Sequence, residues 1–61
     1  MKINQYDCVK LKDGREGTII EIFEQEPAYM VEICDNEGRT LDTPIISIGE
    51  IEAITYRHTA N

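Results

Sequence analysis

Tryptophan is absent from this sequence, and histidine, serine and phenylalanine occur once each in 61 residues. Catalysis requires a nucleophile or an acid–base pair that neighbouring groups hold in a pocket. The single histidine, His58, lies close to the end of the sequence, where we expect a mobile tail. The single serine, Ser47, is expected to cap a helical turn. The sequence therefore predicts that the protein is not an enzyme and binds no cofactor.

Cysteine is scarce as well. Cys8 and Cys34 are the only two, and no Cys-x-x-Cys pair is present, so we expect no metal site. Two thiols suffice for one disulfide, but nothing indicates secretion, and the sequence favours two reduced cysteines. A reactive thiolate needs cationic neighbours, whereas Cys34 lies beside Glu32 and Asp35. Neither cysteine is therefore expected to act as a nucleophile.

Positive charge is limited too. Twelve acidic residues stand against six basic ones, which gives a formal net charge of −6. Only Lys10, Lys12 and Arg15 lie close together, and we interpret them as solvated surface charge. Nucleic-acid binding, which depends on clustered Lys and Arg, is therefore disfavoured.

Long apolar runs are missing throughout the chain. No stretch approaches the roughly 20 apolar residues of a membrane-spanning helix, and the first residues do not resemble a signal peptide. We expect a cytoplasmic protein that makes no membrane contact.

What the sequence does contain is β-branched residues in short runs. Ten isoleucines and two valines outnumber three alanines and two leucines, a composition that favours strands. Turn-forming residues separate the runs, as in a meander of strands. The predicted strands cover approximately residues 6–12, 16–24, 28–34, a fourth segment from about 39, and 51–56.

The first two predicted strands carry the most specific signals. Asp13-Gly14 predicts a two-residue hairpin turn of type I′. Ile19 and Ile22 have opposite parity, so a β-bulge near Ile20 and Glu21 is needed to turn both inward. Gly17 suits a position where another strand passes closely.

The later segments complete an all-β fold. Tyr29, Val31 and Ile33 alternate with outward residues on the third strand, and Pro44 is expected to interrupt or expose the fourth. Ser47 to Glu50 has a capping-box pattern, which predicts a 3₁₀ turn before the last strand. We therefore predict a small five-stranded SH3-like barrel forming one domain over residues 1–61. Residues 5–56 should be ordered and 57–61 should form a tail.

The first hairpin resembles the KOW motif of ribosomal proteins and transcription elongation factors. Its matching residues are Asp7-x-Val9-x-Leu11 and Asp13-Gly14-Arg15-x-Gly17-Thr18-Ile19-x-x-Ile22. The whole chain is more similar to small bacterial proteins of the DUF4926 type, through Tyr29-Met30-Val31-Glu32-Ile33, Asp35-x-x-Gly38-x-Thr40 and Ile48-x-x-Ile51-x-x-Ile54. This resemblance implies the barrel fold and leaves the function open.

Without a catalytic constellation, a binding role is the leading hypothesis. The chain lacks the Trp-containing aromatic groove with which SH3 domains read proline-rich peptides. We predict a non-catalytic protein-binding or accessory module that contacts an unknown protein partner and could form a homodimer through an unpaired edge strand. Candidate contact residues are Tyr6, Phe23, Met30, Glu21, Glu24 and Glu32. Two alternatives remain: a KOW-like nucleic-acid-associated module that uses Lys10, Lys12 and Arg15, or an acidic inhibitor or antitoxin-like protein.

Overall fold

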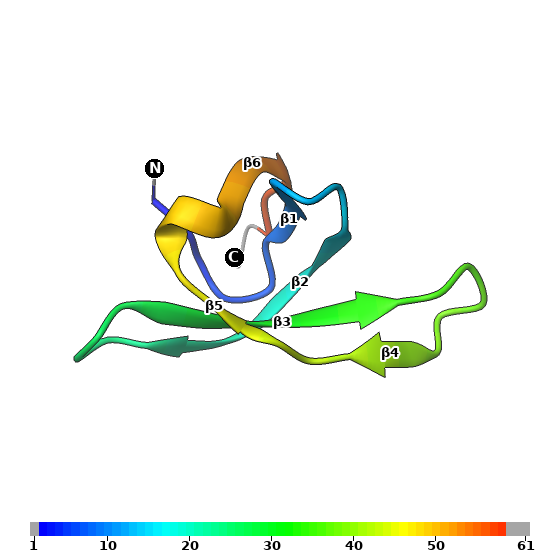
Figure 1. Cartoon of the computed structure of the whole chain (residues 1–61), viewed down its shortest axis with the longest axis horizontal. Coiled ribbons are helices and arrows are strands. Elements are labelled where there is room, and N and C mark those ends of the chain that lie inside the picture. Colours follow the sequence, from blue (N-terminus) through cyan, green and yellow to red (C-terminus); the bar gives the residue numbers. More distant parts are fainter. Residues whose placement is uncertain (1, 59–61) are drawn as a thin grey trace.

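The computed structural model describes residues 2–58 and shows an all-β fold with a single 3₁₀ turn, η1 (Figure 1). The sheet is open, with strand order β4-β3-β2-β1-β6 and with β5 also paired to β3. Within residues 2–58 there is no helix with the length and apolar character needed to cross a membrane. The elements are β1 (Cys8–Leu11), β2 (Glu16–Phe23), β3 (Ala28–Cys34), β4 (Thr40–Asp42), β5 (Ile45–Ile46), η1 (Ile48–Glu50) and β6 (Ile51–Tyr56).

The structure has six strands where the sequence predicted five, because the fourth strand is divided at Thr43 and Pro44. The Ile33–Asp42 and Met30–Ile45 pairs differ by three residues on each strand, so the register along β3 continues from Asp42 of β4 into β5. Within β4 the register shifts by one residue, between the Ile33–Asp42 and Cys34–Thr40 pairs. Pro44 has no N–H to donate, but its carbonyl oxygen accepts from Val31 N at 3.0 Å. The expected interruption at proline is confirmed, and it yields two short strands on the same edge.

The β1–β2 turn differs from the predicted two-residue type I′ turn. Leu11 N donates to Arg15 O at 2.8 Å, which leaves three residues, 12–14, in the loop. Gly14 has a φ of 97°, whereas Asp13 is not left-handed. A type I turn followed by a left-handed glycine is the usual three-residue hairpin loop. The β3–β4 turn repeats this arrangement, with Gly38 at φ 82° and Asp35 N donating to Arg39 O at 2.9 Å.

The bulge predicted in β2 is confirmed. Ile19 pairs with Val31 and Glu21 pairs with Met30, so Ile20 is the additional residue. This shift turns both Ile19 and Ile22 toward the core, where Ile19 is fully buried and Ile22 packs against the cluster. The bulge therefore also sets which side chains of β2 face outward beyond it, namely Glu21 and Phe23.

The core lies on the inner face of the bent sheet. Val9 and Leu11 from β1 and Val31 and Ile33 from β3 are buried, as the alternation predicted. Tyr29 is half-buried and packs against this cluster. Buried aliphatic side chains stabilise by about 1.5–3 kcal/mol each, so a small set of them dominates the stability of so short a chain. The other buried hydrophobic residues are Ile3, Ile19, Ile46 and Ile51.

The 3₁₀ turn forms where the capping-box pattern predicted it. Glu50 Oε2 accepts a hydrogen bond from Ser47 N at 3.0 Å, and Glu50 N donates to Ser47 O at the same distance. Lys12 N donates to Glu50 O at 2.9 Å, which ties the β1–β2 turn to the segment before β6. The turn thus brings the chain from the β3 edge to the β1 edge of the sheet.

Candidate functional site

Four apolar side chains form a continuous patch on the outer face of β2, β3 and β5. Phe23 pairs directly with Ala28, and Met30 pairs directly with Ile45. Because directly paired residues share a face of the sheet, these four residues lie on the side opposite the core. Phe23 is 39% exposed and Ile45 is 60% exposed. We call Phe23, Ala28, Met30 and Ile45 the docking patch.

A hollow of about 490 Å³ opens at the docking patch, beside the β2–β3 turn. This turn forms the left tip of the molecule in Figure 1. Phe23, Ala28 and Ile45 supply the apolar lining, and Glu24, Gln25 and Glu26 line the turn side. Glu21 lies opposite Met30 on the same outer face. We call Glu21, Glu24 and Glu26 the acidic rim.

The structure brings together four of the six residues predicted as contact residues: Phe23, Met30, Glu21 and Glu24. Glu32 shares the outer face but lies opposite Thr18, and its Oε2 accepts from Thr40 Oγ1 at 2.8 Å. Tyr6 belongs to neither the patch nor the rim. It lies before β1, where its ring meets His58 edge-on with 5.6 Å between the ring centroids.

Two residues of the docking patch were missed by sequence reasoning, Ala28 and Ile45. A signal for Ile45 was present, because Ile45 and Ile46 are adjacent and successive strand residues face opposite sides. Ile46 is buried, so Ile45 must point outward. Ala28 gave no comparable signal, since a small side chain at the start of a strand is compatible with either face.

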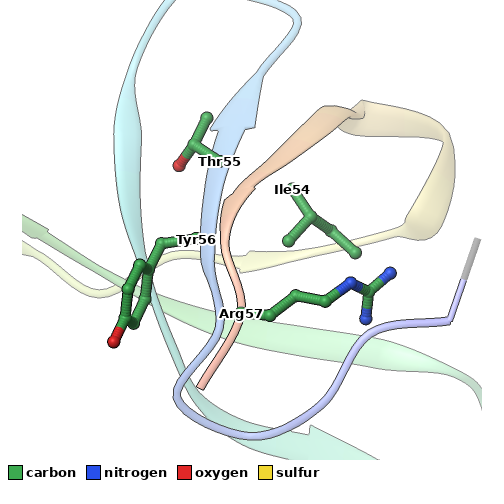
Figure 2. A pocket seen from close by; sticks show the side chains of 4 residues that line it. All are labelled: Ile54, Thr55, Tyr56 and Arg57. Carbon is green, nitrogen blue, oxygen red and sulfur yellow. The ribbon is translucent and has the colours of Figure 1, made fainter. Parts of the chain in front are cut away.

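A second hollow, of about 410 Å³, lies along β6 and is lined by Ile54, Thr55, Tyr56 and Arg57 (Figure 2). These are consecutive residues at the outer edge of the sheet, where β6 pairs with β1 alone. Figure 2 shows Tyr56 and Arg57 pointing to opposite sides of the strand. Such side chains do not converge on a common ligand, so this hollow is the open strand edge rather than a binding cleft.

Most basic side chains are engaged by carboxylates of the protein itself. Lys10 Nζ lies 3.7 Å from Glu52 Oε2, and Arg15 Nε lies 2.9 Å from Asp13 Oδ2. Arg15 Nη1 is also 3.8 Å from an oxygen of Asp42. Two of the three residues in the predicted basic cluster therefore already have anionic neighbours.

Asp7 is the one buried charged residue identified in the described chain, with 0% exposure. Its Oδ2 accepts from Asn4 N at 3.0 Å, and its Oδ1 accepts from His58 N at 2.8 Å. Arg57 Nη1 is 3.8 Å from Oδ2. Burial raises the pKa of Asp7, but the hydrogen bonds from Asn4 and His58 and the nearby positive charge of Arg57 outweigh it, so the pKa lies below the usual 3.8.

The Asp7 contacts join the two ends of the described chain. Arg57 Nη1 donates to Lys2 O at 3.2 Å, and His58 is held at its backbone by Asp7. The sequence had placed Arg57 and His58 in a tail, and the structure instead connects both to Asp7. Residues 59–61, also predicted as tail, lie outside the described residues. We interpret Asp7 as a structural latch, because its carboxylate oxygens accept from the protein itself.

The geometry of the two cysteines is incompatible with a disulfide between them. Cys8 pairs with Thr18 and Thr18 pairs with Glu32, so β2 separates the strands that carry Cys8 and Cys34. Two strand spacings place the Cα atoms about 10 Å apart or more, beyond the roughly 7 Å that a disulfide tolerates. Both thiols are free. Within residues 2–58, no group of three His, Cys, Asp or Glu residues is placed to hold a metal ion.

We expect Cys34 to react several-fold faster than Cys8 with a thiol reagent in the native protein. Cys34 is exposed, whereas Cys8 is half-buried and its sulfur lies 3.6 Å from Thr18 Oγ1. Accessibility governs such reactions when no cation activates either thiol. Stopped-flow titration of C8S and C34S variants measures each rate separately. Equal rates, or an intramolecular disulfide in the oxidised native monomer, would contradict the described arrangement.

Comparison with known proteins gives one match. A family model described as a domain of unknown function (DUF4926) matches residues 3–53. No curated protein and no solved structure matches the chain. The match covers β1 to β5, η1 and the first half of β6, together with the docking patch and the acidic rim.

Proposed function

The chain belongs to the DUF4926 family, and from the geometry of its outer face we propose that it is a non-catalytic module that binds a protein partner through the docking patch. The observation that carries this proposal is the hollow lined by Phe23, Ala28 and Ile45. Apolar side chains exposed together and bordered by polar residues are typical of protein contact surfaces.

The docking patch lies on strands whose opposite face packs into the core, as suits a contact surface. Phe23, Ala28 and Met30 lie on the paired strands β2 and β3, and their neighbours Ile22, Tyr29 and Val31 pack into the core on the opposite face. Binding would therefore require little ordering of the backbone, which lowers the entropic cost of association.

We also propose that the fold is of the SH3-like type. The strand order, the 3₁₀ turn before the last strand and the return of β6 to pair with β1 support this assignment. Arg15 in the β1–β2 turn lies 3.8 Å from Asp42 of β4, at the opposite edge of the sheet, in the manner of a partly closed barrel. The KOW-like likeness, a bacterial origin and a cytoplasmic location remain predictions.

A nucleic-acid-associated role has less support. Lys10 and Arg15, two of its three expected phosphate contacts, lie beside Glu52, Asp13 and Asp42. A phosphate would have to displace these carboxylates. The acidic inhibitor hypothesis is compatible with the docking patch, because Glu24 and Glu26 of the acidic rim line the same hollow and an inhibited enzyme would itself be the protein partner.

We expect the I45S variant to lose its native partner while the L41S variant retains it. Leu41 is the matched control for Ile45, because both are aliphatic residues on edge strands and their exposed fractions are similar, 65% for Leu41 and 60% for Ile45. Of these two residues, Ile45 lines the hollow and Leu41 does not. A residue at the centre of an interface contributes enough binding energy for at least a tenfold loss of affinity. The measurement is affinity capture from nuclease-treated lysate, followed by titration with the purified partner.

Retention of the partner by both variants would remove the docking patch from the proposal. Loss by both would indicate a general defect, which urea unfolding of each variant detects. Loss of all retained material on nuclease treatment of the wild type would favour the nucleic-acid hypothesis. The predicted homodimer is checked on the same preparations by sedimentation equilibrium.

A further inference from the structure

The acidic rim surrounds the β2–β3 turn, and residues 21–30 supply no Lys or Arg side chain to pair with it. The two other hairpin turns within residues 2–58 each contain an arginine that pairs with their carboxylates. Arg15 neutralises Asp13 in the β1–β2 turn, and Arg39 lies 3.0 Å from Asp35 and 3.2 Å from Glu37 in the β3–β4 turn. Residues 21–30 contain three glutamates and neither Lys nor Arg. None of these glutamates belongs to an ion pair of the described chain.

From this contrast we propose that the docking patch binds a cationic amphipathic segment of a partner protein, in which an apolar side chain enters the hollow and flanking Lys or Arg residues contact the acidic rim. This inference rests on the proposed function. Glu24 and Glu26 line the same hollow as Phe23, Ala28 and Ile45, so one short segment can reach both kinds of group. Complementary charge of this type sets partner choice and speeds association.

A second copy of this chain is a poorer occupant of the docking patch. A two-fold interface places the same surface of both copies in contact. It would therefore bring two acidic rims together without any basic residue in the 21–30 segment to separate them. Like charges facing each other oppose association, and a chain of net charge −6 adds to this repulsion.

The test uses three short synthetic peptides and NMR of the ¹⁵N-labelled full chain. One peptide combines Lys with Leu, the second replaces every Lys with Glu, and the third contains Lys without Leu. We expect the Lys/Leu peptide to shift the amide signals of the non-proline residues of segment 21–30 and of Ile45. The other two should bind at least tenfold more weakly. Raising the salt from about 0.05 to about 0.5 M should weaken Lys/Leu binding strongly, because exposed charges are screened.

Two charge-reversal variants provide the matched comparison. E24K/E26K changes the acidic rim, whereas E16K/E37K makes the same change in net charge at residues outside the hollow. Glu16 begins β2, and Glu37 lies in the β3–β4 turn at the opposite tip of the molecule in Figure 1. We expect E24K/E26K to weaken Lys/Leu peptide binding at least tenfold and E16K/E37K to weaken it only a few-fold.

The outcomes distinguish a failure of this inference from a failure of the proposed function. Equal loss in both charge variants would overturn the cationic specificity, since only net charge would then matter. If I45S and not L41S still abolishes native partner binding, the proposed function survives that result. Binding of the Lys-only peptide as tightly as the Lys/Leu peptide would overturn the amphipathic requirement. Peptide shifts outside residues 21–30 and 45, self-association through the patch, or binding of a short RNA at the patch would overturn the inference directly.

Discussion

Replacing Gly17 with alanine is expected to destabilise the protein by about 3 kcal/mol. Gly17 faces the core opposite Val9, and a Cβ atom there would lie 2.5 Å from the backbone oxygen of Glu32. The same Cβ would lie 2.6 Å from Val31 Cγ1 and 2.9 Å from Ile33 Cδ1. Real Cβ atoms do not approach other heavy atoms this closely, so β2 and β3 must separate locally. Urea unfolding at pH 7 measures the loss.

Gly49 provides the control for this substitution. Its nearest non-neighbouring heavy atom is Ser47 Oγ, 4.0 Å from the position of an added Cβ. We expect the G49A variant to lie within about 0.5 kcal/mol of the wild type. The reason for the contrast is backbone proximity, and V31A in the G17A background should therefore fail to restore stability. A G17A protein as stable as the wild type would show that β2 and β3 do not approach at Gly17 as described.

Gly17 and the bulge at Ile20 illustrate what the sequence could predict. In both places a local pattern admits one physical solution. Two isoleucines of opposite parity cannot both enter the core without an extra residue between them, and the bulge supplies it. A glycine at the start of an apolar strand has little reason to be there unless another backbone passes close by. The buried residues Val9, Leu11, Val31 and Ile33 followed from alternation alone.

The errors came from choices that short patterns do not resolve. An Asp-Gly pair serves a two-residue loop and a three-residue loop almost equally well, since both need a left-handed glycine. The outcome depends on which backbone pair closes the loop, here Leu11 with Arg15. The sequence predicted only Phe23 and Met30 of the docking patch. The position of Ile45 beside Met30 depends on β5 pairing with β3, which no local pattern indicates. Sequence alternation indicates which face a residue takes but not which strand will neighbour it.

Asp7 could not be predicted as a buried residue at all. Its two hydrogen-bond donors are backbone N–H groups, and that of His58 is 51 residues away. Because a backbone N–H is present at every non-proline residue, the residue types Asn4 and His58 do not identify these positions as partners of Asp7. Tyr6, directly before it, adopts a left-handed φ of 71° and donates from its N to Ile19 O at 2.6 Å. A non-glycine residue in this region costs free energy, so tertiary contacts must hold this turn in place.

Replacing Asp7 with asparagine is expected to cost about 3 kcal/mol at pH 7, comparable to losing a buried, charge-assisted hydrogen bond. Both carboxylate oxygens accept from N–H groups, Oδ1 from His58 and Oδ2 from Asn4. An asparagine offers only one oxygen, so its NH₂ group must face one of these donors. Urea unfolding of D7N measures the loss. D42N is the control, because Asp42 is exposed and its substitution should change the stability by no more than about 0.5 kcal/mol.

The same carboxylate should make stability depend on acid. The pKa of Asp7 is lower in the folded protein than the usual 3.8, because backbone hydrogen bonds and positive charge outweigh the effect of burial. The unfolded chain therefore binds a proton more readily, and the stabilisation is fully present above about pH 4 and disappears as the pH falls through the folded pKa. D7N lacks this contribution at every pH. The stability difference between wild type and D7N should consequently be largest near neutrality and should shrink steadily below pH 4. If the stability difference between wild type and D7N stays constant down to pH 2, the Asp7 charge does not stabilise the contacts with Asn4 and His58, and the substitution acts through packing alone.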